Sequence, residues 1–136
     1  MNQRLAHIAI VVDDYDKAIK FYTEKLGFQL LEDTTLSESK RWVRVAPKGL
    51  TTCGLLLAKG VGEEQISRIG NQTGGRVFLF LYTDDFWRDY HKYIENDIRF
   101  VREPVEEEYG VVAVFEDIYG NLWDLIMEKG VRLVHL

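Results

Sequence analysis

The sequence predicts an α+β fold in which two tandem βαβββ modules form one curved mixed sheet around a cleft, with the helices on the convex side. The first observation is the stretch LAHIAIVVDDYDKAIKFYTEKLGF, residues 5–28, whose pattern predicts a strand, a turn and an amphipathic helix. The second is RVFLFLYTDDFWRDYHKYIENDIRF, residues 76–100, which repeats that plan 71 residues later when the two Asp-Asp pairs are aligned. The third is a match between LLLAKG and LIMEKG at an offset of 70 residues.

The length and the repeat together define the domain organisation. A chain of 136 residues suits one domain, 1–136, and neither half can bury both a sheet face and a helix stripe alone. The modules are expected at about 4–60 and 76–130. The glycine-rich segment between them, residues 60–75, is interpreted as the crossing from one module to the other.

The first module begins with a strand from Leu5 to Val12, followed by Asp13 and Asp14, which are good helix N-cap residues. The helix runs to about Leu26. Apolar residues at helical spacing predict its buried stripe: Tyr15, Ala18, Ile19, Tyr22 and Leu26. Three further strands are predicted, near 29–31, 41–46 and 53–58.

The second module repeats the order. Phe86, Tyr90 and Ile94 are expected to form the buried stripe of its helix. Strands follow near 99–102, 111–116 and 122–127. The run EPVEEEYG, residues 103–110, is interpreted as a solvated loop over the cleft mouth, and YGN, residues 119–121, as a tight turn. The tail VRLVHL, residues 131–136, is compatible with an edge strand, an oligomer contact or a frayed end.

Alternation along each strand assigns side chains to the two faces of the sheet. The row of Ile8, Ile10 and Val12 suits the layer under the helices, as does the row of Trp123, Leu125 and Met127. The opposite rows are then expected to line the cleft: His7, Trp42, Arg44, Phe78, Phe80, Tyr82, Glu116, Asp124 and Ile126.

The expected cleft has apolar and aromatic walls with a few polar groups, which suits a small-molecule ligand. Arg44 among aromatic residues favours an anionic or planar aromatic compound, since guanidinium pairs with carboxylates and stacks on rings. Tyr109 is predicted to reach a ligand from the loop over the cleft mouth. Glu116 has two interpretations, an ion pair with Arg44 and a ligand role.

The composition excludes several classes of function. A net charge of −5 argues against nucleic acid as the main partner. No apolar run approaches the length of a membrane span, and the N-terminus has no signal-peptide pattern. The single cysteine, Cys53, cannot form an internal disulfide, which fits a cytoplasmic location.

The duplicated unit, the opening HIAIVVDDYDKAIKFYTEKLGF and the closing FEDIYGNLWDL resemble the vicinal oxygen chelate superfamily. That superfamily contains glyoxalase I, extradiol dioxygenases, fosfomycin-resistance enzymes and bleomycin-resistance proteins. The resemblance covers nearly the whole chain and implies the fold. It leaves the activity open, because one scaffold serves several chemistries and some pure binders. Related proteins often form dimers, so a homodimer is expected.

The resemblance also implies where metal ligands would lie, namely at His7, Gly54, Phe78 and Asp124. Only His7 and Asp124 carry side chains that bind metal, and an iron site of the dioxygenase type needs three protein ligands. Glu116 can offer a further oxygen. One divalent ion (Fe, Mn, Ni or Zn) and no metal therefore both stay open. Without metal, His7 and Asp124 can form an imidazole–carboxylate pair that acts as a general base.

Two functions follow from these residues. The first is an enzyme of the lyase or dioxygenase type with an incomplete metal site, in which His7, Asp124 and Glu116 are catalytic. The alternative is a metal-free protein that sequesters a small molecule, as bleomycin-resistance proteins do. The ligand-binding residues would be Trp42, Arg44, Phe78, Phe80, Tyr82 and Tyr109. The surviving His/Asp pair favours the enzyme, and the incomplete ligand set favours the binder.

Overall fold

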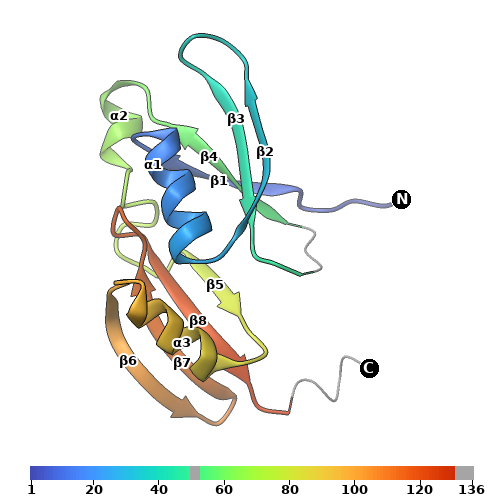
Figure 1. Cartoon of the computed structure of the whole chain (residues 1–136), viewed down its shortest axis with the longest axis vertical. Helices are drawn as coiled ribbons and strands as arrows, with labels where there is room; N and C mark the ends of the chain where they lie inside the picture. Colours follow the sequence, from blue (N-terminus) through green and yellow to red (C-terminus); the bar gives the residue numbers. More distant parts are fainter. Residues whose placement is uncertain (50–52, 131–136) are drawn as a thin grey trace. The chain divides into compact units, whose positions relative to one another are not determined.

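The computed structural model describes residues 1–49 and 53–130. The chain divides into two compact units, 1–72 and 73–136, which we call the first and second module. Each module contains one four-stranded mixed sheet (Figure 1). The boundary falls within the glycine-rich segment that the sequence predicts as the crossing. The tail at 131–136 lies outside the described residues.

The sheet of the first module has the strand order β1-β4-β3-β2. Its strands are β1 (His7–Val12), β2 (Gln29–Thr35), β3 (Arg41–Ala46) and β4 (Gly54–Lys59). β1 runs parallel to β4, whereas β3 is antiparallel to both β4 and β2. A parallel pair requires a crossover connection, and the helix after β1 is part of it.

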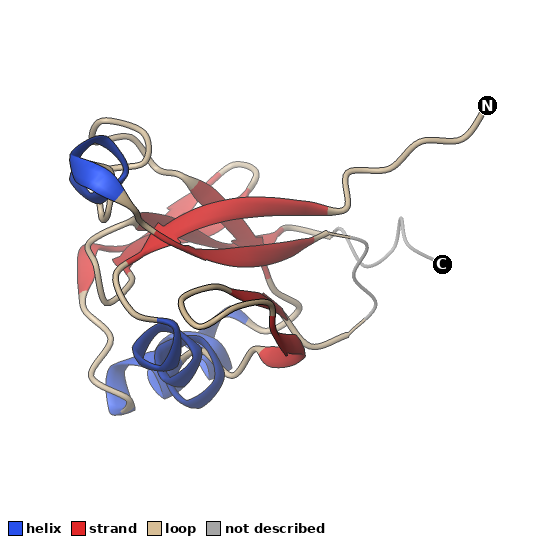
Figure 2. Ribbon diagram, turned by 90° about the horizontal axis from the view of Figure 1, so that it is seen from above, coloured by secondary structure: helices blue, strands red, loops and turns tan. Residues whose placement is uncertain are grey.

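Helix α1 (Tyr15–Lys20) follows β1 and continues as a π-helical turn, η1 (Phe21–Lys25). The predicted cap is confirmed, because the Asp14 carboxylate accepts a hydrogen bond of 2.9 Å from the backbone N–H of Lys17. α1 lies against β3 and β4 (Figures 1 and 2). Four of the five predicted stripe residues are buried, and the fifth is half-buried: Tyr15, Ala18, Tyr22, Leu26 and, half-buried, Ile19.

A short helix that the sequence does not predict, α2 (Gly62–Ser67), lies in the glycine-rich crossing. The side chain of Gln65 closes its first turn by accepting a 2.8 Å hydrogen bond from the backbone N–H of Val61. Val61 and Ile66 are 75% and 54% exposed. The helix buries no residue, so it has no apolar stripe for the sequence to reveal.

The second module has the equivalent order, β5-β8-β7-β6, which confirms the duplication. Its strands are β5 (Leu79–Tyr82), β6 (Phe100–Glu107), β7 (Gly110–Glu116) and β8 (Leu122–Glu128). β5 is parallel to β8, and β7 is antiparallel to β8 and β6. Both modules thus have the α+β, βαβββ arrangement that the sequence predicts.

Helix α3 (Phe86–Glu95) is capped by Asp85, which accepts a hydrogen bond from the backbone N–H of Arg88 at 3.2 Å. Its predicted stripe is partly wrong. Phe86 is fully buried, but Ile94 is 47% exposed and Tyr93, at 5% exposure, lies inward in its place. The Tyr93 ring packs edge-on against that of Phe115 with centroids 5.3 Å apart. Among the described residues, no helix is long and apolar enough to cross a membrane.

The predicted loop at 103–110 is also wrong, because most of it belongs to strand β6. Val105 pairs with Val112, and Glu107 pairs with Gly110 across the hairpin. Pro104 lies where the register shifts between Arg102 and Val105, on a strand at the edge of the sheet. Edge strands and bulges tolerate proline, since its missing N–H costs no ladder hydrogen bond there.

One face of each sheet carries the core. The side chains that the sequence assigns to the layer under the helices include the most buried residues of the chain. In the first module these are Ile10, Val12, Val43, Val45 and Leu57; in the second they are Ala113, Phe115, Trp123 and Leu125. The remaining face of each sheet is therefore where the candidate site residues project.

Candidate functional site

In the first module, strand register places three predicted site residues on the same face of the sheet. Ala9 pairs with Leu56, and Leu56 pairs with Arg44, so these positions share a face. His7 is two residues from Ala9 and Trp42 is two residues from Arg44, so both project to the same side. This face is opposite to the one that carries the buried core residues of β3.

His7 stands at the start of β1, directly opposite Gly54 of β4. Its imidazole meets the Trp42 indole edge-on, with ring centroids 5.6 Å apart and an interplanar angle of 81°. The Nδ1 atom of His7 is buried and has no hydrogen-bond partner among the described residues. A Cβ at Gly54 would lie 3.0 Å from the Val45 carbonyl oxygen, so the backbone leaves little room for a side chain opposite His7.

Arg44, at the centre of β3, has the same unmet hydrogen-bonding capacity. Its Nη1 atom lies 3.4 Å from the Glu32 carboxylate across the β2–β3 pair. Its Nε atom is buried and has no partner in the described part of the chain. Native proteins rarely leave a buried polar atom unpaired, so each such atom calls for an explanation.

The His7–Trp42–Arg44 face therefore combines three complementary groups. The guanidinium offers a positive charge and a buried donor, the imidazole can donate or accept a hydrogen bond, and the indole offers an apolar surface. This combination suits a small planar molecule that carries an acidic group.

In the second module, a comparable row crosses the sheet on the face opposite the core. Phe80 of β5 pairs with Asp124 of β8, which pairs with Val114 of β7. Tyr82 pairs with Ile126 and lies on the same side. Phe80 and Tyr82 are 59% and 58% exposed, which is unusual for aromatic side chains on a strand.

Asp124 is the acidic group of this row, and it is half-buried. Burial raises the pKa of its carboxyl group above the usual range, and the positive charge of Arg102 opposes that rise only partly. A carboxyl group in such a place holds its proton to a higher pH and is suited to proton transfer.

The three other predicted residues of this module lie near the ends of its strands. Glu116, at the end of β7, has its carboxylate 3.8 Å from the Arg99 guanidinium. Phe78 precedes β5, is half-buried, and donates its backbone N–H to the Leu122 carbonyl at 2.8 Å. Tyr109 is 55% exposed in the turn between β6 and β7, so it belongs to a hairpin rather than to the long loop predicted there.

The pairing corrects one positional equivalence between the modules. His7, seven residues before the N-cap Asp14, pairs with Gly54. Phe78 lies seven residues before the N-cap Asp85, yet the residue paired with Asp124 is Phe80. Asp124 is therefore the structural counterpart of Leu56 and not of Gly54. The error arose because LLLAKG and LIMEKG match in sequence but pair with their neighbouring strands in different registers.

The donor set within either module alone does not fit a divalent metal ion. Over residues 1–49 and 53–130, no three His, Cys, Asp or Glu side chains come together. His7 faces Gly54 and Trp42 instead of a second ligand. A His7–Asp124 pair would join the two modules and stays a prediction. The ion pairs of Arg44 and Glu116 in the structure, with Glu32 and Arg99, are within their own modules.

A buried polar turn that supports β8 was predicted only as a tight turn. Asp117 is 3% exposed, and its carboxylate accepts hydrogen bonds of 2.9 Å from the backbone N–H groups of Tyr119 and Asn121. The Asn121 side chain adds a third, at 2.8 Å. The turn residues YGN signal this structure, and it fixes the start of the strand that carries Asp124.

Comparisons with known proteins agree with the fold. An uncharacterized protein of Shewanella frigidimarina is 60% identical over 127 residues, covering 93% of this chain and 94% of that protein. The crystal structure of UcmS2 is 35% identical with a TM-score of 0.81, covering 93% of this chain and 98% of that one.

A further solved structure is that of TnmS3, an antibiotic binding protein from Streptomyces sp. CB03234. It is 28% identical with a TM-score of 0.75, and the match covers 94% of this chain and 98% of that one. Residues 4–125 match the family model described as Glyoxalase/Bleomycin resistance protein/Dioxygenase superfamily. The chain belongs to the Glyoxalase/Bleomycin resistance protein/Dioxygenase superfamily.

Proposed function

We propose that this protein binds a small aromatic molecule with an acidic group, without transforming it, on the His7–Trp42–Arg44 face. One observation carries the proposal: two buried polar atoms, His7 Nδ1 and Arg44 Nε, have no partner among the described residues. They lie on the same face of one sheet as Trp42, whose indole touches the imidazole.

The energetic reasoning favours a ligand with acceptor atoms. An unsatisfied buried donor costs about 1–3 kcal/mol, and a ligand that satisfies it recovers that cost on binding. A carboxylate or sulfonate can accept from Arg44 Nε in a charge-assisted hydrogen bond. An aromatic ring of the same ligand can pack on the Trp42 indole.

The relatives support binding of this kind. TnmS3, at 28% identity, is an antibiotic binding protein, so this scaffold accommodates a small molecule in a relative that aligns over nearly its whole length. In the second module, the predicted ligand-binding residues Phe80 and Tyr82 expose aromatic side chains on their own sheet. Aromatic surface exposed on a strand is a common feature of binding faces.

The test is a fluorescence titration with 1-anilinonaphthalene-8-sulfonate, an aromatic anion. We expect saturable binding that Arg44→Gln weakens about tenfold, because the substitution removes a charge-assisted hydrogen bond. The matched control is Arg68→Gln, which removes the same charge from an exposed position at the end of α2. His7→Ala and Trp42→Leu should also weaken binding.

Equal affinities for Arg44→Gln and Arg68→Gln would reject the proposal, as would an absence of saturation in the wild type. The circular dichroism spectrum of each variant must match that of the wild type. A variant with a changed spectrum is partly unfolded, and its dye binding is then not compared.

An enzyme of the lyase or dioxygenase type is the second candidate. It is favoured by Asp124, whose carboxyl pKa is raised by burial, as a proton-transfer group should be. In this alternative His7, Asp124 and Glu116 are the reactive groups. The test is to measure Mn, Fe, Ni and Zn in protein purified without chelator. Stoichiometric metal that His7→Ala abolishes would favour the enzyme over the binder, and metal-free protein after soaking would reject a metal-dependent one.

We further propose that the protein acts as a cytoplasmic homodimer with a small-molecule ligand. The single cysteine fits the reducing compartment, and the dimer is inferred from the family. Light scattering at micromolar concentration should give twice the chain mass of 15.8 kDa, and a monomer mass would contradict the dimer.

A further inference from the structure

The second module contains a cavity of about 410 Å³ at the ends of β5 and β8, beside the first turn of α3. We propose that this cavity is a separate binding site for a planar organic cation. All of its lining residues belong to the second module. The proposal is therefore independent of the face that carries His7, Trp42 and Arg44.

Aromatic and apolar side chains form the walls of the cavity. Trp87 and Tyr82 line it from α3 and β5, and they are 44% and 58% exposed. Val111 and Met127, from β7 and β8, add apolar surface. An aromatic ring attracts a cation over its face, and tryptophan does so most strongly. The volume lies within the range of pockets that hold small molecules.

The charge around the cavity is negative. Three carboxylate residues line it, Asp84, Glu106 and Glu128, against a single ammonium group on Lys129. Asp84 pairs with Arg88 at 3.0 Å. Within residues 1–49 and 53–130, neither Glu106 nor Glu128 takes part in an ion pair, so their charges are available to a ligand. A cation is the ligand that such an arrangement favours.

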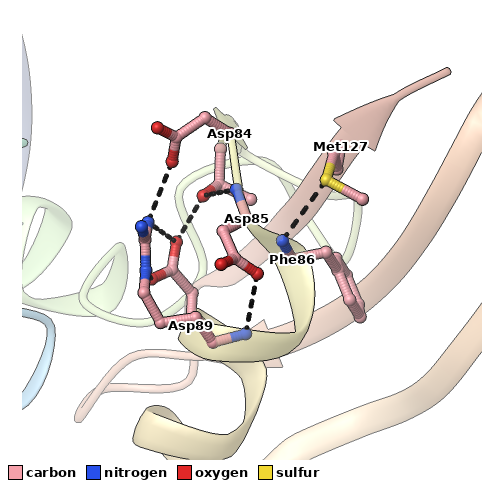
Figure 3. A network of polar contacts seen from close by, with 7 residues as sticks. Asp84, Asp85, Phe86, Asp89 and Met127 are labelled. Atoms are coloured by element: carbon pink, nitrogen blue, oxygen red, sulfur yellow. Dashed lines mark hydrogen bonds and ion pairs between the residues drawn. The ribbon is translucent and has the colours of Figure 1, made fainter. Parts of the chain in front are cut away.

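Hydrogen bonds and ion pairs hold the β5–α3 turn, which forms one wall of the cavity (Figure 3). Thr83 donates its hydroxyl to the Asp89 carboxylate and accepts a 3.1 Å hydrogen bond from the backbone N–H of Asp85. Arg88 binds Asp89 at 2.9 Å. These contacts define the first turn of the helix and so fix the backbone that carries Trp87. Preorganisation of this kind lowers the entropy lost on binding.

The turn is also attached to the strand that forms the far wall. The backbone N–H of Phe86 points at the sulfur of Met127, 3.4 Å away, and Phe86 itself is fully buried (Figure 3). Helix α3 and strand β8 are therefore joined at the edge of the cavity. This contact places the backbone that carries Trp87 close to Met127.

The experiment uses proflavine, a planar aromatic cation whose fluorescence reports binding to the full chain. We expect saturable binding that the double variant Glu106→Gln/Glu128→Gln weakens about tenfold, because it removes two unpaired carboxylates at the cavity. Trp87→Leu should weaken it about threefold by removing the cation–π contact. The matched control is Glu63→Gln/Glu64→Gln, which removes the same charge from exposed positions on α2.

Two results would overturn the proposal: no saturable proflavine binding, or equal weakening by the two double variants, which would indicate attraction by net charge alone. The carboxamide variants keep the side-chain shape at exposed Glu106 and half-buried Glu128, so they are expected to fold, and circular dichroism checks this. Titrating the same variants with 1-anilinonaphthalene-8-sulfonate separates the two sites. The Glu106→Gln/Glu128→Gln variant should bind that anion as the wild type does, and Arg44→Gln should bind proflavine as the wild type does.

Discussion

Arg41 shows how a single residue joins three parts of the first module. Its guanidinium makes two hydrogen bonds to the Asp33 carboxylate, at 2.8 and 3.1 Å, and an ion pair with Asp16 of α1 at 2.9 Å. It also lies 5.2 Å from the centre of the Tyr15 ring. The hydrogen bond from Arg41 lowers the pKa of the Asp33 carboxyl below its usual value. The start of β3 is thereby attached to both β2 and α1.

Arg41→Lys should lower the free energy of unfolding by about 1 kcal/mol. Lysine keeps the charge but loses the two-point geometry with Asp33 and the planar contact with Tyr15. Urea unfolding followed by circular dichroism measures the change. Arg68→Lys, a control on the exposed end of α2, should have almost no effect, and equal losses in the two variants would contradict this role for Arg41.

Asp124→Asn should change how stability depends on pH. The folded protein holds the Asp124 proton to a higher pH than the unfolded chain does, because burial raises the pKa of the carboxyl group. Raising the pH from below the ordinary aspartate value through the folded-state pKa therefore costs stability in the wild type, and the amide removes that cost.

The stability of Asp124→Asn relative to wild type should thus be greater at pH 7 than at pH 3, where the carboxyl group is protonated in both states. Chemical unfolding at both pH values measures the difference. Glu95→Gln, on the exposed surface of α3, is measured in parallel as the control. A gain for Asp124→Asn that is the same at both pH values would show that the carboxylate is not destabilised by burial.

At the scale of the elements, the hairpins are built on close backbone contacts. Gly110 begins β7 with a φ of 155° and pairs with Glu128 of β8. A Cβ at this position would overlap the Met127 carbonyl oxygen and lie 2.9 Å from the Glu128 Cα. Both are backbone atoms of a paired strand, so they cannot move aside without breaking the ladder.

Gly110→Ala should therefore lower the free energy of unfolding by about 3 kcal/mol or more, at the upper end of single substitutions. Gly74→Ala is the matched comparison. Gly74 also has a positive φ, of 70°, but no atom would lie within 4 Å of its added Cβ, so only backbone strain of about 1 kcal/mol is expected. Thermal unfolding of both variants measures the two losses of stability. Similar losses would mean that a shift of β8 relieves the close contact at Gly110.

The elements also show which parts of the fold the sequence could predict. Strand faces were correctly predicted because the alternating pattern directly reflects which side of each sheet is buried, as at Ile10 and Val12. Asp14 and Asp85 were recognised as caps because capping depends on local chemistry. The assignment of Ile94 to the core failed because Tyr93 fits against Phe115, a contact made 22 positions further along the chain.

In the candidate site, too, local features could be predicted from the sequence and features that depend on tertiary contacts could not. The common face of His7, Trp42 and Arg44 follows from strand parity, which the sequence contains. Their unpaired atoms do not, because hydrogen-bond satisfaction depends on the exact neighbours that pairing brings together. The pairing of Asp124 with Phe80 was likewise missed, since strand register is set by tertiary contacts and turn geometry.

At the scale of the whole molecule, a duplicated fold explains why the two modules differ in chemistry. Each repeats the same sheet and helix, so the core positions are constrained in both. The opposite faces of the two sheets differ in their side chains. In the first module that face carries an imidazole and a guanidinium, and in the second it carries a carboxyl group and exposed aromatic rings. We therefore expect the function of this protein to depend on these faces, since a fold alone does not determine function.

The central claim is that the face with His7, Trp42 and Arg44 binds an aromatic anion, and the three tryptophans of the chain make a direct test possible. An NMR titration with 1-anilinonaphthalene-8-sulfonate follows the indole N–H signals of Trp42, Trp87 and Trp123 separately. We predict a saturable shift of the Trp42 signal while the other two stay in place. A shift confined to Trp87 or Trp123, or no shift of any indole at saturating dye, would contradict the claim.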